Sequence, residues 1–424
     1  MRFLFGPLLL LCLLGCSAQQ EAPSGHWSGT AQHQGRREHV ELTIDEGGRS
    51  GLLRIDEERV LRRIVIRPDG PRFSFNIATD NPIQVSGETV GDEIRMVAQS
   101  GPVRVPFRLQ RSPPPPPPPY GEEELHFSGG GPRLNASLLS PAGKGPHPAI
   151  ILIHGSSTPS REDFRFYADA FARCGVATLI YDKRPVVGPD GVTRASLAEL
   201  AADARAGADR LRSDPRIDPR RVGYWGHSQG GWVAPIAAAA DPRAAFVISF
   251  SGPVASFAEV NRYADLQRLK QRGFSAGEIG AAGDAIDRLD DYVRRGGDEA
   301  RFQGFLQTAR RQPWAPFTSL TSGPPTQEDR RTWLRWRDQD IDAAGYWKRL
   351  HIPVLALFGA QDDVVPVQFS VQRLQAAVKE AGNSGATIRI FNAGHGIERQ
   401  PEFMPNMLRW LRTEMHLPRR TDCP

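Results

Sequence analysis

Six short apolar runs, separated by helix-length segments, constrain how most of this chain can fold. Each run is apolar along its length, as a strand buried on both faces of a parallel sheet must be. The runs occupy residues 148–154, 176–182, 221–227, 244–250, 353–359 and 387–391. The predicted helices between them occupy residues 163–173, 195–213, 230–240 and 367–381. Strands that alternate with helices in this way predict an α/β fold with a doubly wound, mostly parallel sheet.

One long insertion, at residues 256–347, interrupts this alternation. Segments that follow the carboxyl ends of strands face the ligand-binding edge of such a sheet, so we expect a helical cap over that edge. The insertion is rich in aromatic side chains: Phe274, Trp314, Phe317, Trp333, Trp336, Tyr346 and Trp347. These side chains either line an acyl or aryl pocket or form the core of the cap itself.

The chain ahead of this sheet has a different pattern. Residues 24–110 alternate apolar and polar side chains in short runs between Gly, Asp and Pro, which predicts a small antiparallel β domain, a barrel or a sandwich. A linker at residues 111–121 contains seven consecutive prolines, and such a run forms a spacer of about 22 Å. The α/β domain is then expected at residues 122–417, with a tail at residues 418–424.

The N-terminus predicts export. Arg2 and the apolar residues 3–14, too short to span a membrane, are typical of a signal peptide, which we place at residues 1–15. The motif LLGC ends at Cys16 and resembles the bacterial lipobox, whose cysteine is lipidated and becomes the new N-terminus. Ser17, not aspartate, follows, which in Gram-negative bacteria favours the outer membrane. We therefore expect a lipid anchor in the bacterial cell envelope; the alternative is an ordinary signal peptide with an incidental cysteine.

Composition argues against several classes of partner. The 424 residues carry a formal net charge of +5, but only five of the 53 basic residues are lysines. The arginines form no basic stripe, so we expect no nucleic-acid partner. Cysteine and histidine spacings typical of zinc sites are absent from the sequence, and we expect no metal and no cofactor. After lipidation of Cys16, Cys174 and Cys423 remain as thiols, and the sequence leaves open whether they pair.

The most specific motif is WGHSQGG at residues 225–231, where a predicted strand ends and a predicted helix begins. A G-x-S-x-G sequence at a strand–turn–helix junction is typical of the nucleophile elbow of α/β-hydrolases. Strand and helix approach so closely at Gly226 and Gly230 that a Cβ atom would clash. Ser228 is then expected to be a nucleophile in a strained backbone conformation. The alternative is an ordinary serine in a glycine-rich turn.

A serine nucleophile needs a base, and the base needs an orienting acid that precedes it in this fold. Among the ten histidines, His395 in FNAGHGIE follows the last predicted strand on a glycine-flanked loop, and we predict it as the base. The acid is expected after Gly359, where GAQDDVVP offers Asp362 and Asp363. This run resembles the hydrolase pattern G-x-x-D-x-x-V-P, which favours Asp362 and leaves Asp363 as a solvated neighbour or a helix cap.

Two backbone N–H groups are expected to form an oxyanion hole. The first belongs to Gln229, directly after the nucleophile and at the positive end of the new helix. The second is expected in the loop after residues 148–154, where Gly155 allows close approach and Ser156 supplies the N–H. His154 is expected to shape this loop and not to react.

Together these motifs make residues 122–417 similar to bacterial α/β-hydrolases, in the group that contains dienelactone hydrolases, prolyl-oligopeptidase-like catalytic domains and acyl-thioester hydrolases. IHGSS, YDKR, DPRRVGYWGHSQGG, GAQDDVVP and GHG occur in family order. One departure is Pro185 after YDKR, where many relatives carry glycine, which puts the contacts of that loop in doubt. Lys183 and Arg184 there either orient a carboxylated substrate or make structural pairs.

The resemblance implies an enzyme: a serine hydrolase that cleaves a small-molecule carboxylic ester or thioester through an acyl-enzyme. The nearest alternative is a serine aminopeptidase or other peptidase, with Glu259, Glu278 or Asp338 of the insertion binding the substrate amine. Residues 24–110 are too few for the propeller of a prolyl oligopeptidase, and the sequence indicates no partner for this β domain. An alternative of another class is a non-catalytic lipoprotein that binds ligands at the cell surface.

Overall fold

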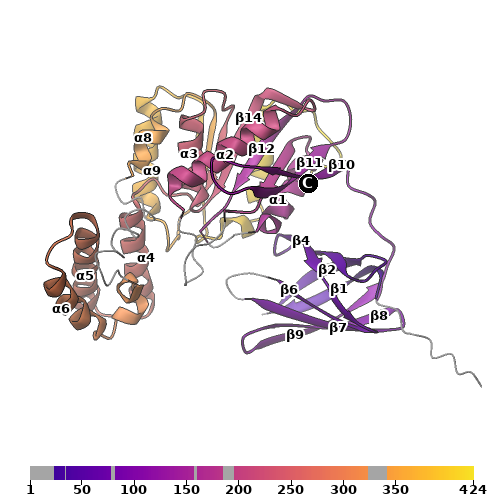
Figure 1. Ribbon diagram of the computed structural model, residues 1–424, viewed down its shortest axis with the longest axis horizontal. Coiled ribbons are helices and arrows are strands. Elements are labelled where there is room, and N and C mark those ends of the chain that lie inside the picture. Colours follow the sequence, from indigo (N-terminus) through magenta and orange to yellow (C-terminus); the bar gives the residue numbers. More distant parts are fainter. Residues whose placement is uncertain (1–22, 34, 78–81, 157–159, 185–194, 323–340) are drawn as a thin grey trace, which may run out of the picture. The chain divides into compact units, whose positions relative to one another are not determined.

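The computed structural model describes residues 23–33, 35–77, 82–156, 160–184, 195–322 and 341–424. The chain divides into two compact units, which Figure 1 shows in the colours of the sequence. The first contains the chain up to Arg54 together with Arg63–Pro114, and the second contains Ile55–Arg62 together with Pro115–Pro424. Within the described ranges, no helix is both long enough and apolar enough to cross a membrane.

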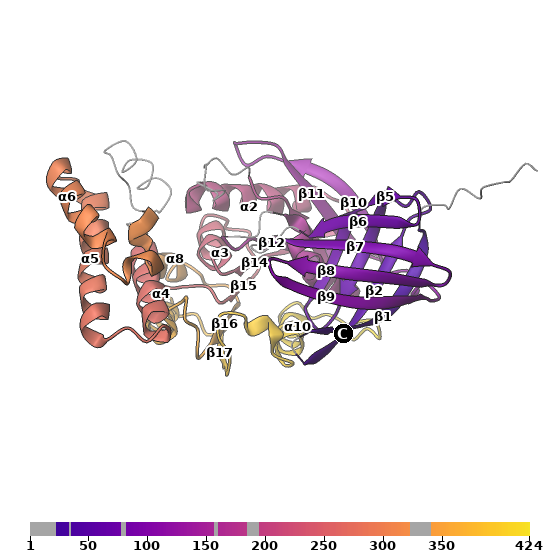
Figure 2. The ribbon, with the colours of Figure 1, turned by 90° about the horizontal axis from the view of Figure 1, so that it is seen from below.

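The first unit is an antiparallel sheet of nine strands in the described part of the chain. Its strands are β1 (Gly25–His33), β2 (Arg36–Ile44), β3 (Ser50–Ile55), β4 (Val60–Val65), β5 (Arg67–Asp69), β6 (Arg72–Ile77), β7 (Ile83–Val90), β8 (Glu93–Ser100) and β9 (Val103–Arg111). Their order is β4-β3-β2-β1-β9-β8-β7-β6-β5. The edge strands β4 and β5 are consecutive in the chain, so the sheet curls round on itself, and Figure 2 shows β6–β9 lying across β1 and β2.

Alternation along these strands produces the core of the first unit. On β2, Val40, Leu42 and Ile44 are buried while the side chains between them are more exposed, and Phe73 and Phe75 repeat the pattern on β6. Successive side chains of a strand point to opposite faces, so the buried set lies on one face of the sheet. A small all-β unit therefore precedes the α/β unit.

The second unit is built on a mixed, mostly parallel sheet. Its strands are β10 (Tyr120–Phe127), β11 (Leu134–Pro141), β12 (His147–Ile153), β13 (Ala177–Tyr181), β14 (Ile217–His227), β15 (Val247–Phe250), β16 (Val354–Gly359) and β17 (Ala386–Phe391). Their order is β10-β11-β13-β12-β14-β15-β16-β17. The pairs β10–β11 and β11–β13 are antiparallel, and the remaining pairs are parallel. The six apolar runs of the sequence correspond to β12–β17, so the predicted mostly parallel sheet is confirmed.

Helices cover both faces of this sheet. One face packs against α1 (Arg165–Arg173) and α10 (Phe403–Glu414). The other packs against α2 (Leu197–Arg212), α3 (Gly230–Ala239), α8 (Ala343–Trp347) and α9 (Val367–Glu380). Local sequence sets where they start: Ser196 and Glu199 form a capping box at the first turn of α2. The sheet therefore lies between two helical layers.

Two segments that are distant in the sequence contact the side of the sheet that α1 covers. Leu61, from Ile55–Arg62, lies in its apolar cluster, and Arg62 Nη1 donates to Asp163 Oδ1 at 2.6 Å. Cys174, directly after α1, forms a disulfide with Cys423, which follows 249 residues later. The structure thus supplies a pairing that the sequence left open.

The insertion forms a helical cap with its own core. Its elements are α4 (Phe257–Gln271), α5 (Ala276–Arg295), α6 (Glu299–Arg310) and the 3-10 turns η2 (Ala315–Phe317) and η3 (Ser319–Ser322). The end of the insertion differs from the prediction, because α8 packs against α3 and α9 and buries Trp347 in the core of the main sheet. Among the described residues, the cap therefore ends before α8.

The described aromatic side chains of the insertion serve mainly as core. Trp314 is 4% exposed and belongs to the apolar cluster of the cap, where the rings of Phe274 and Phe317 lie 5.9 Å apart. Tyr346, in α8, packs partly buried against the core of the main sheet. Trp333 and Trp336 lie outside the described residues. Of the two alternatives from the sequence, the described aromatics fit the core.

Candidate active site

Ser228 lies at the turn between β14 and α3, where the elbow motif predicts it. Its φ is +51°, in the left-handed region that costs a residue with a Cβ about 1–2 kcal/mol. The packing leaves no room for relaxation: a Cβ on Gly226 would overlap the carbonyl oxygen of Gly230, and a Cβ on Gly230 would crowd that of Ile153. A strained backbone therefore holds the hydroxyl at the carboxyl end of β14.

Ser228, His395 and Asp362 form a continuous hydrogen-bonded chain. His395 Nε2 lies 3.1 Å from Ser228 Oγ, and His395 Nδ1 lies 2.8 Å from Asp362 Oδ2. The Asp362 side chain is buried, and its Oδ1 accepts the backbone N–H groups of Val364 and Val365, each at 2.8 Å. A carboxylate at Nδ1 favours the imidazole tautomer whose Nε2 is free to accept the serine proton. The arrangement can therefore activate a serine hydroxyl.

The neighbouring carboxylate, Asp363, has a different partner. Its Oδ2 accepts a hydrogen bond from Gln271 Nε2 of α4 at 2.9 Å. It does not cap the following helix, since α9 begins at Val367 with Pro366 at its N-cap. The cap interpretation of Asp363 is therefore wrong, and of the two carboxylates Asp362 reaches the imidazole.

Two further side chains hold the loops of this chain in place, and sequence reasoning missed both. Ser251, directly after β15, donates its hydroxyl to the carbonyl oxygen of His395 at 2.7 Å. Tyr263 of α4 donates its hydroxyl to the carbonyl oxygen of Asp362 at 2.8 Å. Both act on backbone atoms, which no short motif reports. The cap and β15 thus help to position the base and the acid.

Two other histidines near the site are held neutral. Burial, with a smaller contribution from nearby His395, lowers the pKa of His227 to about 3. His154 is 2% exposed, and its ring meets that of Tyr181 edge-on at 4.9 Å. Burial first, and the charge of Lys183 second, hold the pKa of His154 well below its usual range. Neither of these two rings therefore adds positive charge to the site.

The two expected oxyanion donors lie in loops that one side chain connects. Ser156 follows β12, and Gln229 precedes α3. The ammonium of Lys183, after β13, donates to the carbonyl oxygens of Gly155 at 2.8 Å and Ser156 at 3.4 Å, and to Gln229 Oε1 at 2.6 Å. Arg184 instead pairs with Asp203 at 2.7 Å, in keeping with the structural alternative. Lys183 therefore brings both candidate donor loops within reach of one charge.

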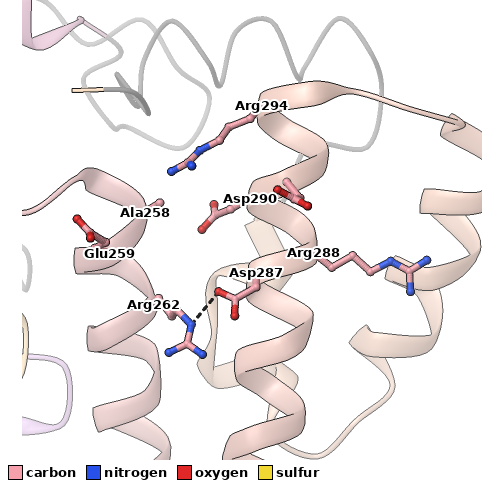
Figure 3. A pocket seen from close by; sticks show the side chains of 8 residues that line it. Ala258, Glu259, Arg262, Asp287, Arg288, Asp290 and Arg294 are labelled. Atoms are coloured by element: carbon pink, nitrogen blue, oxygen red, sulfur yellow. Dashed lines mark hydrogen bonds and ion pairs between the residues drawn. The ribbon is translucent and has the colours of Figure 1, made fainter. Parts of the chain in front are cut away.

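A separate hollow of about 480 Å³ lies in the cap between α4 and α5, and Figure 3 shows its lining side chains. Its walls are carboxylates and guanidinium groups, and Arg262 Nε pairs with Asp287 Oδ1 at 2.7 Å. None of Ser228, Asp362 and His395 lines it. Charged walls do not suit an apolar acyl group.

The two described carboxylates that the peptidase alternative requires, Glu259 and Glu278, have other roles in the structure. Glu259 Oε2 accepts the backbone N–H of Ser256 at 2.7 Å and also pairs with Arg373. Glu278 Oε2 accepts the backbone N–H of Ser275 at 2.8 Å. Both complete capping boxes at helix starts. Cys16, Pro185 and Asp338 lie outside the described residues.

The sequence pattern of the alpha/beta hydrolase family matches residues 150–404, which is more than half of the chain and includes Ser228, Asp362 and His395. The chain belongs to the α/β-hydrolase family. The chain is 32% identical over 118 residues to the thiohydrolase apmlB of Arthrinium phaeospermum, and the match covers 27% of the chain and 38% of that relative. It is also 32% identical over 128 residues to the quorum-quenching protein AidA of Acinetobacter baumannii, and that match covers 30% of the chain and 42% of AidA. The chain thus spans about two-fifths of the length of these curated relatives.

Two solved structures match most of the chain at low sequence identity. The α/β hydrolase GrgF of a Penicillium species is 18% identical with a TM-score of 0.47, and the match covers 70% of this chain and 100% of GrgF. An esterase of Pyrococcus furiosus is 14% identical with a TM-score of 0.46, and that match covers 69% and 91%.

Proposed function

We propose that this chain is a serine hydrolase that cleaves carboxylic esters or thioesters through an acyl-enzyme. The observation that carries the proposal is the continuous hydrogen-bonded chain from Asp362 through His395 to Ser228. Its serine is the strained residue of the elbow. An isolated surface serine would need neither the left-handed backbone nor a histidine whose far nitrogen meets a buried carboxylate.

The geometry performs the reaction in two halves. Ser228 Oγ attacks the acyl carbon while its proton passes to His395 Nε2, and the oxyanion accepts hydrogen bonds from the N–H groups of Gln229 and Ser156. The imidazolium, stabilised by Asp362, then protonates the departing alkoxide or thiolate and leaves an acyl-serine. Water, which gives its proton to His395, attacks the acyl carbon. Collapse of the second oxyanion returns the proton to Ser228 and releases the carboxylic acid.

The described cap favours an ester or thioester over a peptide. A peptidase that recognises a substrate amine needs a carboxylate, and both Glu259 and Glu278 are engaged in helix caps. Amide cleavage also needs extended subsites that hold the scissile bond while a poor leaving group is protonated. The relative in Arthrinium phaeospermum is named a thiohydrolase, which supports the thioester within this class.

The primary test is covalent labelling with a fluorophosphonate, which reacts with activated serines. We expect labelling at Ser228, complete loss in Ser228→Ala, and no change in the matched control Ser213→Ala, whose hydroxyl lies beyond α2. Labelling that persists in Ser228→Ala would refute the assignment. An unlabelled wild-type protein with a normal thermal transition would instead favour the non-catalytic, ligand-binding lipoprotein.

The substrate class is tested on one purified preparation. We expect turnover of p-nitrophenyl esters and acyl thioesters of short to medium chain, and much weaker turnover of aminoacyl or prolyl p-nitroanilides. The leaving thiolate or phenolate needs little protonation, whereas the anilide needs a well-placed proton from His395. Anilide turnover that equals the best ester or thioester would favour the peptidase.

We further propose that Cys16 is lipidated and holds the protein on the bacterial envelope, in the outer membrane if the cell is Gram-negative. The support is the LLGC motif after a short apolar segment. Stable anchoring takes two or more acyl chains, as a lipoprotein N-terminus carries. Cys16→Ser should release the protein from membranes or block processing, and an unlipidated mature N-terminus in intact-mass analysis would contradict the proposal.

A further inference from the structure

Lys183 is buried beside the proposed reaction centre but takes no part in the steps above. It is 6% exposed, although lysine is among the residues least often buried in proteins. Within the described ranges, it makes no ion pair with a carboxylate. A charge taken out of water without a counter-ion is costly unless its hydrogen bonds are satisfied. A purely structural position is better filled by an apolar side chain, so the ammonium calls for another explanation.

Its three acceptors supply one. An ammonium has three N–H donors, and Lys183 directs them to the carbonyl oxygens of Gly155 and Ser156 and to Gln229 Oε1. Gly155 and Ser156 belong to the loop after β12, and Gln229 to the turn before α3. These are the two segments that carry the expected oxyanion donors. One charged group therefore fixes both segments relative to each other.

Because the peptide between Gly155 and Ser156 is planar, the contact between Lys183 and the Gly155 carbonyl also fixes the direction of the Ser156 N–H. In a trans peptide the C=O of one residue and the N–H of the next point in opposite directions. The carbonyl of Gly155 points at Lys183, at 2.8 Å, so the N–H of Ser156 points away from the lysine, on the opposite side of the same peptide. Loss of the ammonium would remove the hydrogen bond that directs this carbonyl, and the N–H on the other side of the peptide could then turn away from an oxyanion.

We propose that Lys183 is a positioning residue for the oxyanion hole, whose protonated ammonium orients the Ser156 N–H and holds the Gln229 segment, so that turnover requires a charged Lys183. This inference rests on the proposed hydrolase function. Lys183 touches neither the substrate nor the reacting atoms, and it acts through the backbone of Gly155 and the side chain of Gln229.

The requirement for a charge makes the reaction pH-dependent on its alkaline side. Burial lowers the pKa of Lys183 to about 7, and a neutral amine offers two N–H donors to three acceptors. Around it, His154 of the β12 end is already neutral. Of its chain neighbours, Asp182 accepts the backbone N–H of Arg161, and Arg184 is paired in its own salt bridge. Lys183 is therefore the group whose titration sets the alkaline limb.

The test is the dependence of kcat and KM on pH, from about pH 6 to about pH 10, for hydrolysis of a p-nitrophenyl ester. Lys183→Met keeps the length of the side chain without its charge. We expect kcat to fall about 10²-fold, the scale of one oxyanion donor, with KM within about threefold and no alkaline limb. Lys183→Arg keeps a permanent charge, and should restore part of kcat and abolish the limb. The control Lys348→Met alters an exposed lysine paired with Glu380 and should behave as wild type.

Gln229→Met separates positioning from a general effect on folding. It removes the acceptor Oε1 but keeps the backbone N–H of residue 229, and it should move the alkaline limb to lower pH, because the ammonium loses a partner. If circular dichroism shows that Lys183→Met does not fold, Gln229→Met and Lys183→Arg still test whether Lys183 positions the oxyanion donors. Wild-type kcat and an unchanged limb in the Lys183 and Gln229 variants would overturn the inference while the hydrolase proposal stands. A wild-type protein that neither turns over esters nor reacts with fluorophosphonate would overturn both.

Discussion

Asp362→Asn tests the assignment of the acid, because the surroundings of Asp362 dictate how an amide would sit there. Oδ1 accepts two backbone N–H groups, from Val364 and Val365, at 2.8 Å each. An asparagine must keep its oxygen on these donors, since its NH2 group there would face two N–H groups. Its NH2 then faces His395 Nδ1 and can only donate. The imidazole is driven to the tautomer with a proton on Nε2, which cannot accept the Ser228 proton.

The expected loss in kcat/KM is about 10⁴-fold, as for a triad held in the wrong tautomer, which corresponds to about 5 kcal/mol of transition-state stabilisation. The assay is ester hydrolysis near neutral pH, with the thermal transition measured in parallel to show that the fold is retained. The matched control is Asp363→Asn, in which an amide oxygen can still accept the Gln271 hydrogen bond, and we expect activity within about twofold of wild type. An Asp362→Asn activity within tenfold of wild type, or a larger loss in the control, would refute the reasoning.

Three further predictions concern stability. Gly226→Ala should lower the thermal transition strongly and abolish fluorophosphonate labelling, because its Cβ would overlap the carbonyl oxygen at the start of α3; Gly277→Ala, with open space at its Cβ, is the control and should be neutral or stabilising. Cys423→Ser should lower the free energy of unfolding by as much as about 5 kcal/mol, since the bond to Cys174 closes a loop with a sequence separation of 249 residues; equal stability with and without reductant in wild type would contradict this. His154 has a folded-state pKa well below the unfolded value, so below about pH 6.5 the unfolded chain binds a proton that the folded chain excludes, and the free energy of unfolding falls by about 1.4 kcal/mol per pH unit. In urea unfolding at several pH values, the free energy of unfolding of His154→Leu should fall less steeply with decreasing pH than that of wild type. Equal dependence on pH in the two proteins would count against a buried neutral ring.

The strands and the side chains of the candidate site could be predicted where the sequence carries a local pattern of residue types. Strands β13, β15 and β16 are buried along their whole length because helices cover both faces of the sheet, so their apolar runs stand out in the sequence. The antiparallel strand β10, by contrast, reads YGEEELHF with several exposed positions. It lies at the edge of the sheet, where one face meets solvent, and so it gave no comparable apolar run.

The side chains that hold the loops of the site in place could not be predicted, because each contacts a residue that is distant in the sequence. Ser251, Tyr263 and Lys183 act on backbone carbonyls that lie 144, 99 and 28 residues away. A carbonyl is present at every residue, so no pairing of residue types marks such contacts. The disulfide between Cys174 and Cys423 was unpredictable for a related reason, since two cysteines 249 residues apart do not reveal a short distance.

Ser228 has a neighbour, Ser251, with the same left-handed backbone conformation, so two strained residues lie together at the site. Ser251 has a φ of +47°, and the adjoining strand ends place the two serines side by side, His227 being paired with Phe250. Each left-handed serine costs about 1–2 kcal/mol that a glycine would largely avoid. Comparing the thermal transitions of Ser228→Gly and Ser228→Ala measures this cost at the elbow, because both lack the hydroxyl and only alanine keeps the Cβ; equal transitions would mean that no strain is stored there. The protein therefore does not reach its highest possible thermal stability at this edge of the sheet. A selection for more thermostable variants would favour replacement of the residues that the proposed reaction needs.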